Sequence, residues 1–300
     1  MLTNFFSNTK PFTSVIIIAL FFVYAFLGYF FEYIPELSIG LFFKFLVLFG
    51  LVNFIKSRNN LTFDNSYFFL IFVILIGYLP ITVSINNVFY SNLILLVYVR
   101  RVYSLQSSKN TIKKLFDSGL WMGISFLIEP FTIVVFPMTF IAILIHQHID
   151  YRRLITHILG FVSPLILYFT YHLWYDQQQK FYALLDFSTY YDFSIYTSFT
   201  LKLSLGVIVT LTFFGFLLKT PKALSIKNVF RKNWILVCIH LLSVFILLLI
   251  IKNRSGAEIA YLLFPCAMII ANGFELLQKK WFSDIILLLL FLGSFVQYLV

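Results

Sequence analysis

Four charged side chains stand out because their types suit chemistry on a phosphate-linked substrate. Two carboxylates, Glu32 and Glu36, lie in the short stretch FEYIPE between two long apolar runs. Two cations, Lys252 and Arg254, lie in the stretch KNRSGAE near the other end of the chain. A carboxylate can deprotonate an acceptor hydroxyl, and a cation neutralises phosphate. If the apolar runs bring these groups to one face, the four residues form a candidate site.

The composition indicates which elements must position these residues. Hydrophobic residues make up 61% of the chain and charged residues 11%, against about 45–50% and about 25% in soluble domains. Several apolar runs approach the roughly 20 residues that cross the hydrocarbon core of a bilayer. The alternating segments of a transmembrane β-barrel are not present in the sequence. The sequence therefore predicts an all-α, polytopic transmembrane helical bundle that forms one integral membrane domain over residues 1–300.

The basic residues predict how this bundle is oriented. With the N-terminus in the cytoplasm, seventeen of the 22 basic residues fall inside, three outside and two within spans. Such an excess of inside lysine and arginine orients membrane proteins, so the net charge of +10 requires no nucleic-acid partner. We expect about eleven spans, at residues 11–31, 39–55, 67–83, 85–99, 115–128, 131–147, 154–174, 198–218, 234–251, 261–277 and 282–299.

Two pairs of these spans are short. Residues 67–99 and 115–147 must each cross twice in 33 residues, where about 40 would be comfortable. Merging each pair into one span would move five basic residues outside, so the charge pattern favours two short, broken hairpins. Their tips, around residues 84–87 and around Glu129 and Pro130, are then expected below the outer surface. Non-helical backbone at that depth needs protein or water around it, which indicates a cavity that opens outward.

Other residue types give no strong pattern. Cys238 and Cys266 both lie in apolar runs, which indicates neither a disulfide framework nor a zinc site. Five histidines, including His146 and His148, do not gather into a ligand set, so we expect no metal and no cofactor. The first apolar run follows a single lysine and lacks a small-residue cleavage site, which favours a retained span over a removed signal peptide.

Two stretches resemble a known enzyme superfamily. Residues 115–144, LFDSGLWMGISFLIEPFTIVVFPMTFIAIL, resemble the Gly-x-x-x-Gly and Pro-rich hairpin of the GT-C superfamily of membrane glycosyltransferases. Residues 254–277 resemble the late Arg, Tyr-Leu-Leu, Pro span of the aminoarabinose and mannosyl transferases of that superfamily. The whole chain also resembles uncharacterised, Phe- and Ile-rich polytopic inner-membrane proteins of Bacteroidota.

The resemblance implies roles for individual residues. In GT-C enzymes an acidic residue of the first outer loop is the catalytic base, a role that falls here to Glu32 or Glu36. The resemblance makes Arg254 or Lys252 the phosphate contact, and Glu129 and Tyr261 are further substrate-binding candidates. The donor is then a sugar linked to polyprenyl phosphate, bound at the periplasmic face of a bacterial inner membrane.

Two other functions compete with glycosyl transfer. One is a non-catalytic integral-membrane subunit or scaffold of a cell-envelope assembly, because the first outer loop has only about seven residues. The other is a transporter, in which the broken hairpins would line a path. In all three cases we expect contact with membrane lipid, and the subunit hypothesis adds membrane-protein partners.

Overall fold

The computed structural model describes the chain except for residues 1, 35, 60, 147–148, 189–191, 226–228, 253, 278 and 299–300. Over the described residues the chain forms thirteen α-helices and five short 3₁₀ helices with no strand, which confirms the predicted all-α class. Six helical segments are long and apolar enough to cross a membrane: Pro11–Phe30, Ile39–Arg58, Tyr151–Trp174, Phe199–Ser225, Phe230–Ile250 and Ala257–Phe274. The chain is thus a multi-pass membrane protein, and the expected eleven crossings stay a prediction.

The helices cluster into two units. Unit 1 comprises Met1–Ser84, Phe193–Val237 and Ser255–Val300, and unit 2 comprises Ile85–Asp192 and Cys238–Arg254. One helix, α11 (Val229–Ile250), belongs to unit 1 in its first part and to unit 2 in its second.

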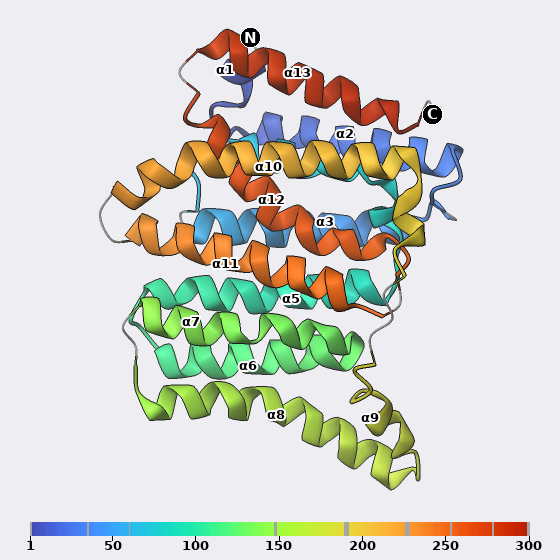
Figure 1. Ribbon diagram of the computed structural model, residues 1–300, viewed down its shortest axis with the longest axis vertical. Helices are drawn as coiled ribbons and strands as arrows, with labels where there is room; N and C mark the ends of the chain where they lie inside the picture. The colour runs from blue at the N-terminus through green and yellow to red at the C-terminus, as the bar shows by residue number, and fades with distance from the viewer. Residues whose placement is uncertain are drawn as a thin grey trace. The chain divides into compact units, whose positions relative to one another are not determined.

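Unit 1 is built around two helices that are buried on nearly every face, α4 (Tyr67–Tyr78) and α12 (Ala260–Phe274). They pack against each other and against α2 (Pro11–Phe30), α10 (Phe199–Ser225) and α13 (Lys280–Val296). A helix that is apolar all round finds a stable place only inside such a bundle. The unit also contains α1 (Leu2–Phe6) and α3 (Ile39–Arg58), both labelled in Figure 1. Its short 3₁₀ helices are η1 (Pro80–Val83), η4 (Ser194–Thr197) and η5 (Ala257–Ile259).

Asparagine side chains fix the connection between α3 and α4. The amide nitrogen of Asn233, on α11, donates to the carbonyl oxygen of Asn59 at 3.0 Å. The amide nitrogen of Asn272, on α12, donates to the carbonyl oxygen of Leu61 at 3.1 Å. Since a buried carbonyl without a partner is costly, these two bonds hold Asn59 and Leu61 against α11 and α12.

In unit 2, α5 (Asn87–Tyr103), α6 (Thr111–Ile128), α7 (Pro137–Ile145) and α8 (Tyr151–Trp174) run side by side (Figure 1). The chain turns back between α6 and α7, so that Val135 and Thr139 both meet Tyr98 on α5. The Tyr98 hydroxyl donates to the Val135 carbonyl oxygen at 3.0 Å and accepts from the Thr139 hydroxyl at 2.9 Å. The unit also contains η2 (Ser104–Gln106), η3 (Pro130–Val135) and α9 (Gln179–Ala183).

Proline ends the first helix of each predicted hairpin, and in the first hairpin this happens at Leu79, before the tip predicted around residues 84–87. Glu129 precedes Pro130 and adopts φ −138° and ψ 98°, outside the helical region. Leu79 precedes Pro80 and adopts φ −132° and ψ 65°. A proline ring clashes with a helical residue before it, so α6 and α4 end at these points.

Glycines let α6 and α8 approach until their backbones touch. A Cβ atom added to Gly123 would lie 2.5 Å from the carbonyl oxygen of Phe161, and one added to Gly160 would lie 2.3 Å from that of Phe116. Small residues four apart are a common means of close helix packing in membranes. The Gly-x-x-x-Gly pattern at Gly119 and Gly123 therefore has a packing role in this fold.

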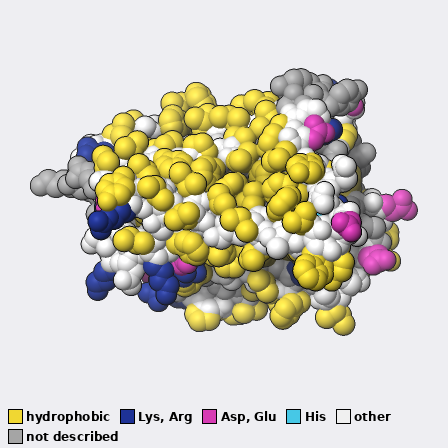
Figure 2. Space-filling model, turned by 90° about the horizontal axis from the view of Figure 1, so that it is seen from below, with side chains coloured by type: hydrophobic (Ala, Val, Ile, Leu, Met, Phe, Trp, Pro, Cys, Tyr) yellow, Lys and Arg dark blue, Asp and Glu magenta, His cyan; other side chains and the backbone are white. Residues whose placement is uncertain are grey.

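The face that α8 presents matches a membrane-embedded surface. Seen from this side, hydrophobic side chains cover the middle of the face, Lys and Arg side chains lie mainly toward one end, and Asp and Glu toward the other (Figure 2). On α8 itself Ile158, Leu159, Ile166 and Leu167 are exposed, as expected of residues that contact lipid.

Candidate functional site

The predicted catalytic carboxylates lie in the turn after α2. Glu32 has a left-handed backbone with φ 62°, and both Glu32 and Glu36 are exposed. The turn is closed by hydrogen bonds from the Glu32 nitrogen to the Tyr29 oxygen, at 3.2 Å, and from the Ile34 nitrogen to the Gly28 oxygen, at 3.1 Å. Within the described part of the chain, neither carboxylate has a hydrogen-bond or ion-pair partner. Each is free to act on a molecule that arrives from outside.

Lys252 already forms an ion pair and a hydrogen bond within the protein. Its ammonium nitrogen lies 3.0 Å from the Asp186 carboxylate and 2.8 Å from the Ser188 hydroxyl. The Asp186 carboxylate accepts hydrogen bonds from Lys252 and, at 3.1 Å, from the Ser188 nitrogen, and these bonds lower its pKa to about 2. Contact between Lys252 and a substrate phosphate would have to displace or join Asp186.

Arg254 acts as a cap for α11. Its guanidinium donates to the carbonyl oxygens of Leu249, at 2.8 Å, and of Asp192, at 2.8 Å. Basic side chains commonly satisfy the last carbonyls of a helix, where the helix dipole is negative. The sequence predicts a phosphate ligand here, and the structure gives the residue a capping role.

The two other predicted residues belong to different units. Glu129 is half-buried at the end of α6 in unit 2, where its carbonyl oxygen accepts from the Thr132 hydroxyl at 2.8 Å. Tyr261 is buried in α12 of unit 1. Because Glu32, Glu36 and Tyr261 belong to unit 1 and Lys252, Arg254 and Glu129 to unit 2, their assembly into one site stays a prediction.

Sequence reasoning did not single out Glu258. This carboxylate is 0% exposed, accepts a hydrogen bond from the Tyr196 hydroxyl, and accepts another from the Ser255 nitrogen at 3.0 Å. The partners satisfy the carboxylate internally, so it ties η4 to η5 and presents no oxygen to a substrate. Of the histidines, His157 is buried against Ser118, and His148 lies outside the described residues.

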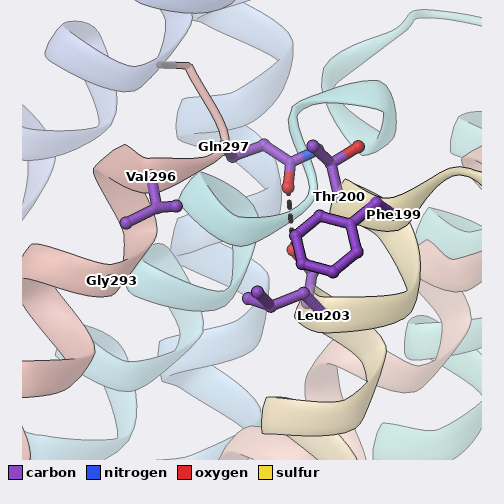
Figure 3. Close-up of a pocket in the computed structure, with 7 residues that line it drawn as sticks. Phe199, Thr200, Leu203, Gly293, Val296 and Gln297 are labelled. Carbon is purple, nitrogen blue, oxygen red and sulfur yellow. Dashed lines mark hydrogen bonds between the residues drawn. The ribbon is translucent and has the colours of Figure 1, made fainter. Parts of the chain in front are cut away.

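The seam between α10 and the end of α13 is too narrow for a substrate. Phe199, Thr200 and Leu203 of α10 face Val296 and Gln297 across it (Figure 3). The Ser204 hydroxyl donates to the Gln297 side-chain oxygen at 2.8 Å and closes the gap. Its volume of about 10 Å³ is about that of one water molecule's site.

A larger, polar pocket lies at the opposite end of unit 1. It has a volume of about 240 Å³ and opens between the start of α2, the end of α3 and the start of α4. We call it the Lys56 pocket. Its polar lining includes Lys10, Ser14, Asn53, Lys56, Asn65 and Ser66.

Lys56 gives this pocket its chemistry. The residue is 4% exposed, and its ammonium nitrogen donates to the carbonyl oxygen of Asn65 at 2.8 Å. Among the described residues the ammonium makes no other hydrogen bond and no ion pair, although it has three N–H donors. Asp64, the acid next to Asn65 in the chain, is exposed and accepts instead from the Thr9 hydroxyl at 2.6 Å.

A buried ion pair lies next to the residues that line the pocket. Lys219 and Glu275 lie 3.3 Å apart, with side chains 3% and 2% exposed. The other carboxylate oxygen of Glu275 accepts from the Phe63 nitrogen at 2.9 Å and from the Asn65 amide nitrogen at 2.7 Å. Asn65 therefore links the ion pair to Lys56.

Sequence reasoning counted Lys56 and Lys219 only as part of the inside charge. The spacing of each lysine from apolar residues of the same helix indicates, in addition, that both lysines are buried. Lys56 follows Phe49 and Val52 at intervals of seven and four residues, and all three share the buried face of α3. Lys219 likewise follows Gly215 by four residues on the buried face of α10. A lysine on an apolar helix face is a candidate for a buried functional cation.

The sequence profile of one protein family matches residues 1–300 of the chain. The chain belongs to DUF6427, a family of unknown function. No curated protein and no solved structure matches it. Because the family carries no assigned activity, the resemblance to GT-C enzymes stays a hypothesis, and the chemistry must be inferred from the residues of this chain.

Proposed function

We propose that this protein binds the phosphate group of a membrane lipid in the Lys56 pocket. The observation that carries the proposal is the Lys56 ammonium group, which is buried, makes one hydrogen bond to described residues and borders a cavity of about 240 Å³. A buried charge is costly without a partner. A phosphate would supply the opposite charge and oxygens for the two remaining donors.

Other parts of the pocket favour an anion as well. Lys10 adds a second positive charge, and the Ser14 hydroxyl can donate to a phosphate oxygen. The pocket also lies at the first turns of α2 and α4, where helix dipoles are positive. The negative charges of Asp64 and Glu275 act in the opposite direction, so a ligand must contact the lysines directly to bind well.

The location favours a lipid over a free phosphate. The pocket lies at the ends of α2 and α3, two helices long enough to cross a bilayer. Phe12, which is 65% exposed, lies on the first turn of α2 beside the pocket residue Pro11. Basic pockets between transmembrane helices on the cytoplasmic side commonly bind lipid headgroups. In the topology that we propose, with about eleven spans in a bacterial inner membrane and a cytoplasmic N-terminus, Lys10 and Lys56 lie on that side.

Lipid-dependent thermal stability of the purified protein tests this function. Phosphatidylglycerol, a polyprenyl monophosphate, phosphatidylcholine and inorganic phosphate are added separately to the protein in mild detergent. We expect the two phosphate lipids with net negative charge to stabilise the wild type, by about 2.7 kcal/mol at a hundredfold excess over Kd. Phosphatidylcholine should have little effect. Stabilisation by inorganic phosphate alone would identify a soluble ligand and contradict the lipid assignment.

Two variants of α3 make the test specific to the pocket. Lys56→Met should weaken binding of the phosphate lipids about tenfold or more, since a hydrogen bond to a charged group contributes about 1.5–3 kcal/mol. Lys44→Met removes an equal charge from the same helix and should leave binding unchanged. Equal binding by wild type and Lys56→Met would exclude this pocket as the site.

Glycosyl transfer is a second candidate, favoured by Glu32. Its exposed carboxylate has no partner among the described residues and is held on a left-handed backbone, a conformation that costs a side chain about 1–2 kcal/mol. Strained positions of this kind cluster at functional sites. Glu32 follows α2 and the Lys56 pocket lies at its start, so about 30 Å of helix separates them. The two functions would therefore use different sites, and the non-catalytic subunit hypothesis needs only the pocket.

A further inference from the structure

The buried ion pair behind the Lys56 pocket needs an explanation other than stability. Removing two charges from water costs several kcal/mol per ion, and replacing a buried pair by apolar residues is often neutral or stabilising. Lys219 also lies over the rings of Phe63 and Phe230, at 5.0 Å and 4.8 Å from their centroids. An apolar pair on α10 and after α12 would pack well in these surroundings.

A relay of hydrogen bonds runs from Glu275 to the pocket. The Glu275 Oε1 atom accepts a hydrogen bond from the Asn65 amide nitrogen at 2.7 Å. The backbone carbonyl oxygen of Asn65 in turn accepts one from the Lys56 ammonium at 2.8 Å. The same Glu275 oxygen accepts from the backbone nitrogen of Phe63 at 2.9 Å, which fixes the chain two residues before Asn65. The Asn65 side-chain oxygen accepts from the Tyr67 nitrogen at 3.2 Å, which orients the amide. The position of the Asn65 carbonyl therefore depends on Glu275.

We infer that Glu275 is a positioning residue for the phosphate site, acting on Lys56 through Asn65. This inference rests on the proposed function, because it assigns a role in lipid binding to a residue that does not line the pocket. Glu275 holds Asn65 so that its carbonyl takes one donor of Lys56 and leaves the other two for the ligand. Lys219 keeps the Glu275 carboxylate in place and compensates its charge.

Two double variants separate this role from a merely structural one. Both carry Lys219→Met, which avoids an unpaired buried lysine. One adds Glu275→Gln, whose amide oxygen can still accept from Phe63 and Asn65, and the other adds Glu275→Leu, which has nearly the same size and no acceptor. The two proteins differ mainly in the hydrogen bonds that position Asn65.

The affinity for phosphatidylglycerol is then measured in the full-length protein by lipid-dependent thermal stability. We expect the variant with Glu275→Gln to bind within about twofold of wild type, since the acceptor is kept. The variant with Glu275→Leu should bind about tenfold more weakly, close to Lys56→Met, because a tenfold change corresponds to about 1.4 kcal/mol, the scale of one hydrogen bond. Equal affinities for the two folded double variants would overturn the inference.

Two controls keep the outcomes distinct. Lys56→Met is measured in parallel, so an unchanged affinity in that variant refutes the proposed function, whereas a loss there with none in the Glu275→Leu variant refutes only the role of Glu275. If the Glu275→Leu variant does not fold, Asn65→Ala removes the same hydrogen bond from the other side and should lower the affinity. Wild-type affinity in Asn65→Ala would also refute the relay.

Discussion

A methyl group built on Gly119 would lie 2.1 Å from the carbonyl oxygen of His157. It would also lie 2.7 Å from the nitrogen of Phe161, one turn further along α8. Both contacts are with backbone atoms, which cannot rotate away as a flexible side chain can. The spacing of α6 and α8, and with it the arrangement of unit 2, depends on this glycine.

Gly119→Ala is therefore expected to destabilise the protein. Overpacking typically costs about 1–3 kcal/mol, and here whole helices must move. At Gly206 on α10 no atom lies within 4 Å of an added Cβ, so Gly206→Ala should instead stabilise by about 0.5–1 kcal/mol. The free energy of unfolding in mixed detergent micelles compares the two. A neutral Gly119→Ala would show that the helices are not in backbone contact.

The backbone of Glu32 gives a second stability prediction. Glycine adopts positive φ without a steric cost, so Glu32→Gly should raise the free energy of unfolding by about 1 kcal/mol. Glu32→Gln keeps a Cβ atom and should leave stability unchanged. Both variants are compared with wild type by denaturation in detergent. A loss of stability in Glu32→Gly would show that the turn does not hold this residue at φ 62°.

The same carboxylate tests glycosyl transfer. If Glu32 is the catalytic base, Glu32→Gln should lower the rate of sugar transfer from a polyprenyl-phosphate donor by about 10² to 10⁴. Glu36→Gln serves as the comparison, because the sequence assigns the same role to either residue. Membranes enriched in each variant are assayed with radiolabelled donor. Equal rates in wild type and both variants would leave the non-catalytic subunit as the better hypothesis.

The orientation of the chain is tested by chemical labelling. The distribution of basic residues places Ser188 outside and Ser225 inside. In a background without Cys238 and Cys266, Ser188→Cys should react with a membrane-impermeant maleimide in intact cells, and Ser225→Cys should react only after lysis. The reverse pattern would move the Lys56 pocket to the outer side and contradict the proposed topology.

The contact between Lys252 and Asp186 predicts a response to pH. The pKa of Asp186 is lowered to about 2, compared with about 3.9 in an unfolded chain. A carboxyl whose pKa is lowered by folding stabilises the folded state at every pH above its pKa in the unfolded chain. This contribution disappears as the pH falls through the folded-state pKa of about 2. Titration of the Asp186 carboxyl carbon by NMR in micelles should give a midpoint near 2. Lys252→Met should move the midpoint back toward its ordinary value, and an identical midpoint in the variant would show that Lys252 does not hold the carboxylate.

The helices and several of their boundaries could be predicted from the sequence because their causes are local. Long apolar runs must satisfy their own backbone hydrogen bonds in a bilayer, so they form helices. Pro80 and Pro130 end α4 and α6 through clashes with the residues directly before them. Glu32 and Glu36 were correctly expected in a short turn between two helices, since charged residues and Pro35, which lies outside the described residues, interrupt an apolar pattern there.

The environment of each charged group was decided only by the tertiary structure. Lys56, Lys219 and Glu275 come from α3, α10 and the end of α12, and no local pattern indicates that hydrogen bonds through Asn65 connect them beside one pocket. Arg254 has the residue type of a phosphate ligand, and only the structure shows that its guanidinium also donates to the carbonyl oxygen of Asp192, 62 residues away in the chain. Residue type limits what a side chain can do, whereas hydrogen bonds and ion pairs depend on distances of about 3 Å between groups far apart in sequence. Only the packing of the helices fixes those distances.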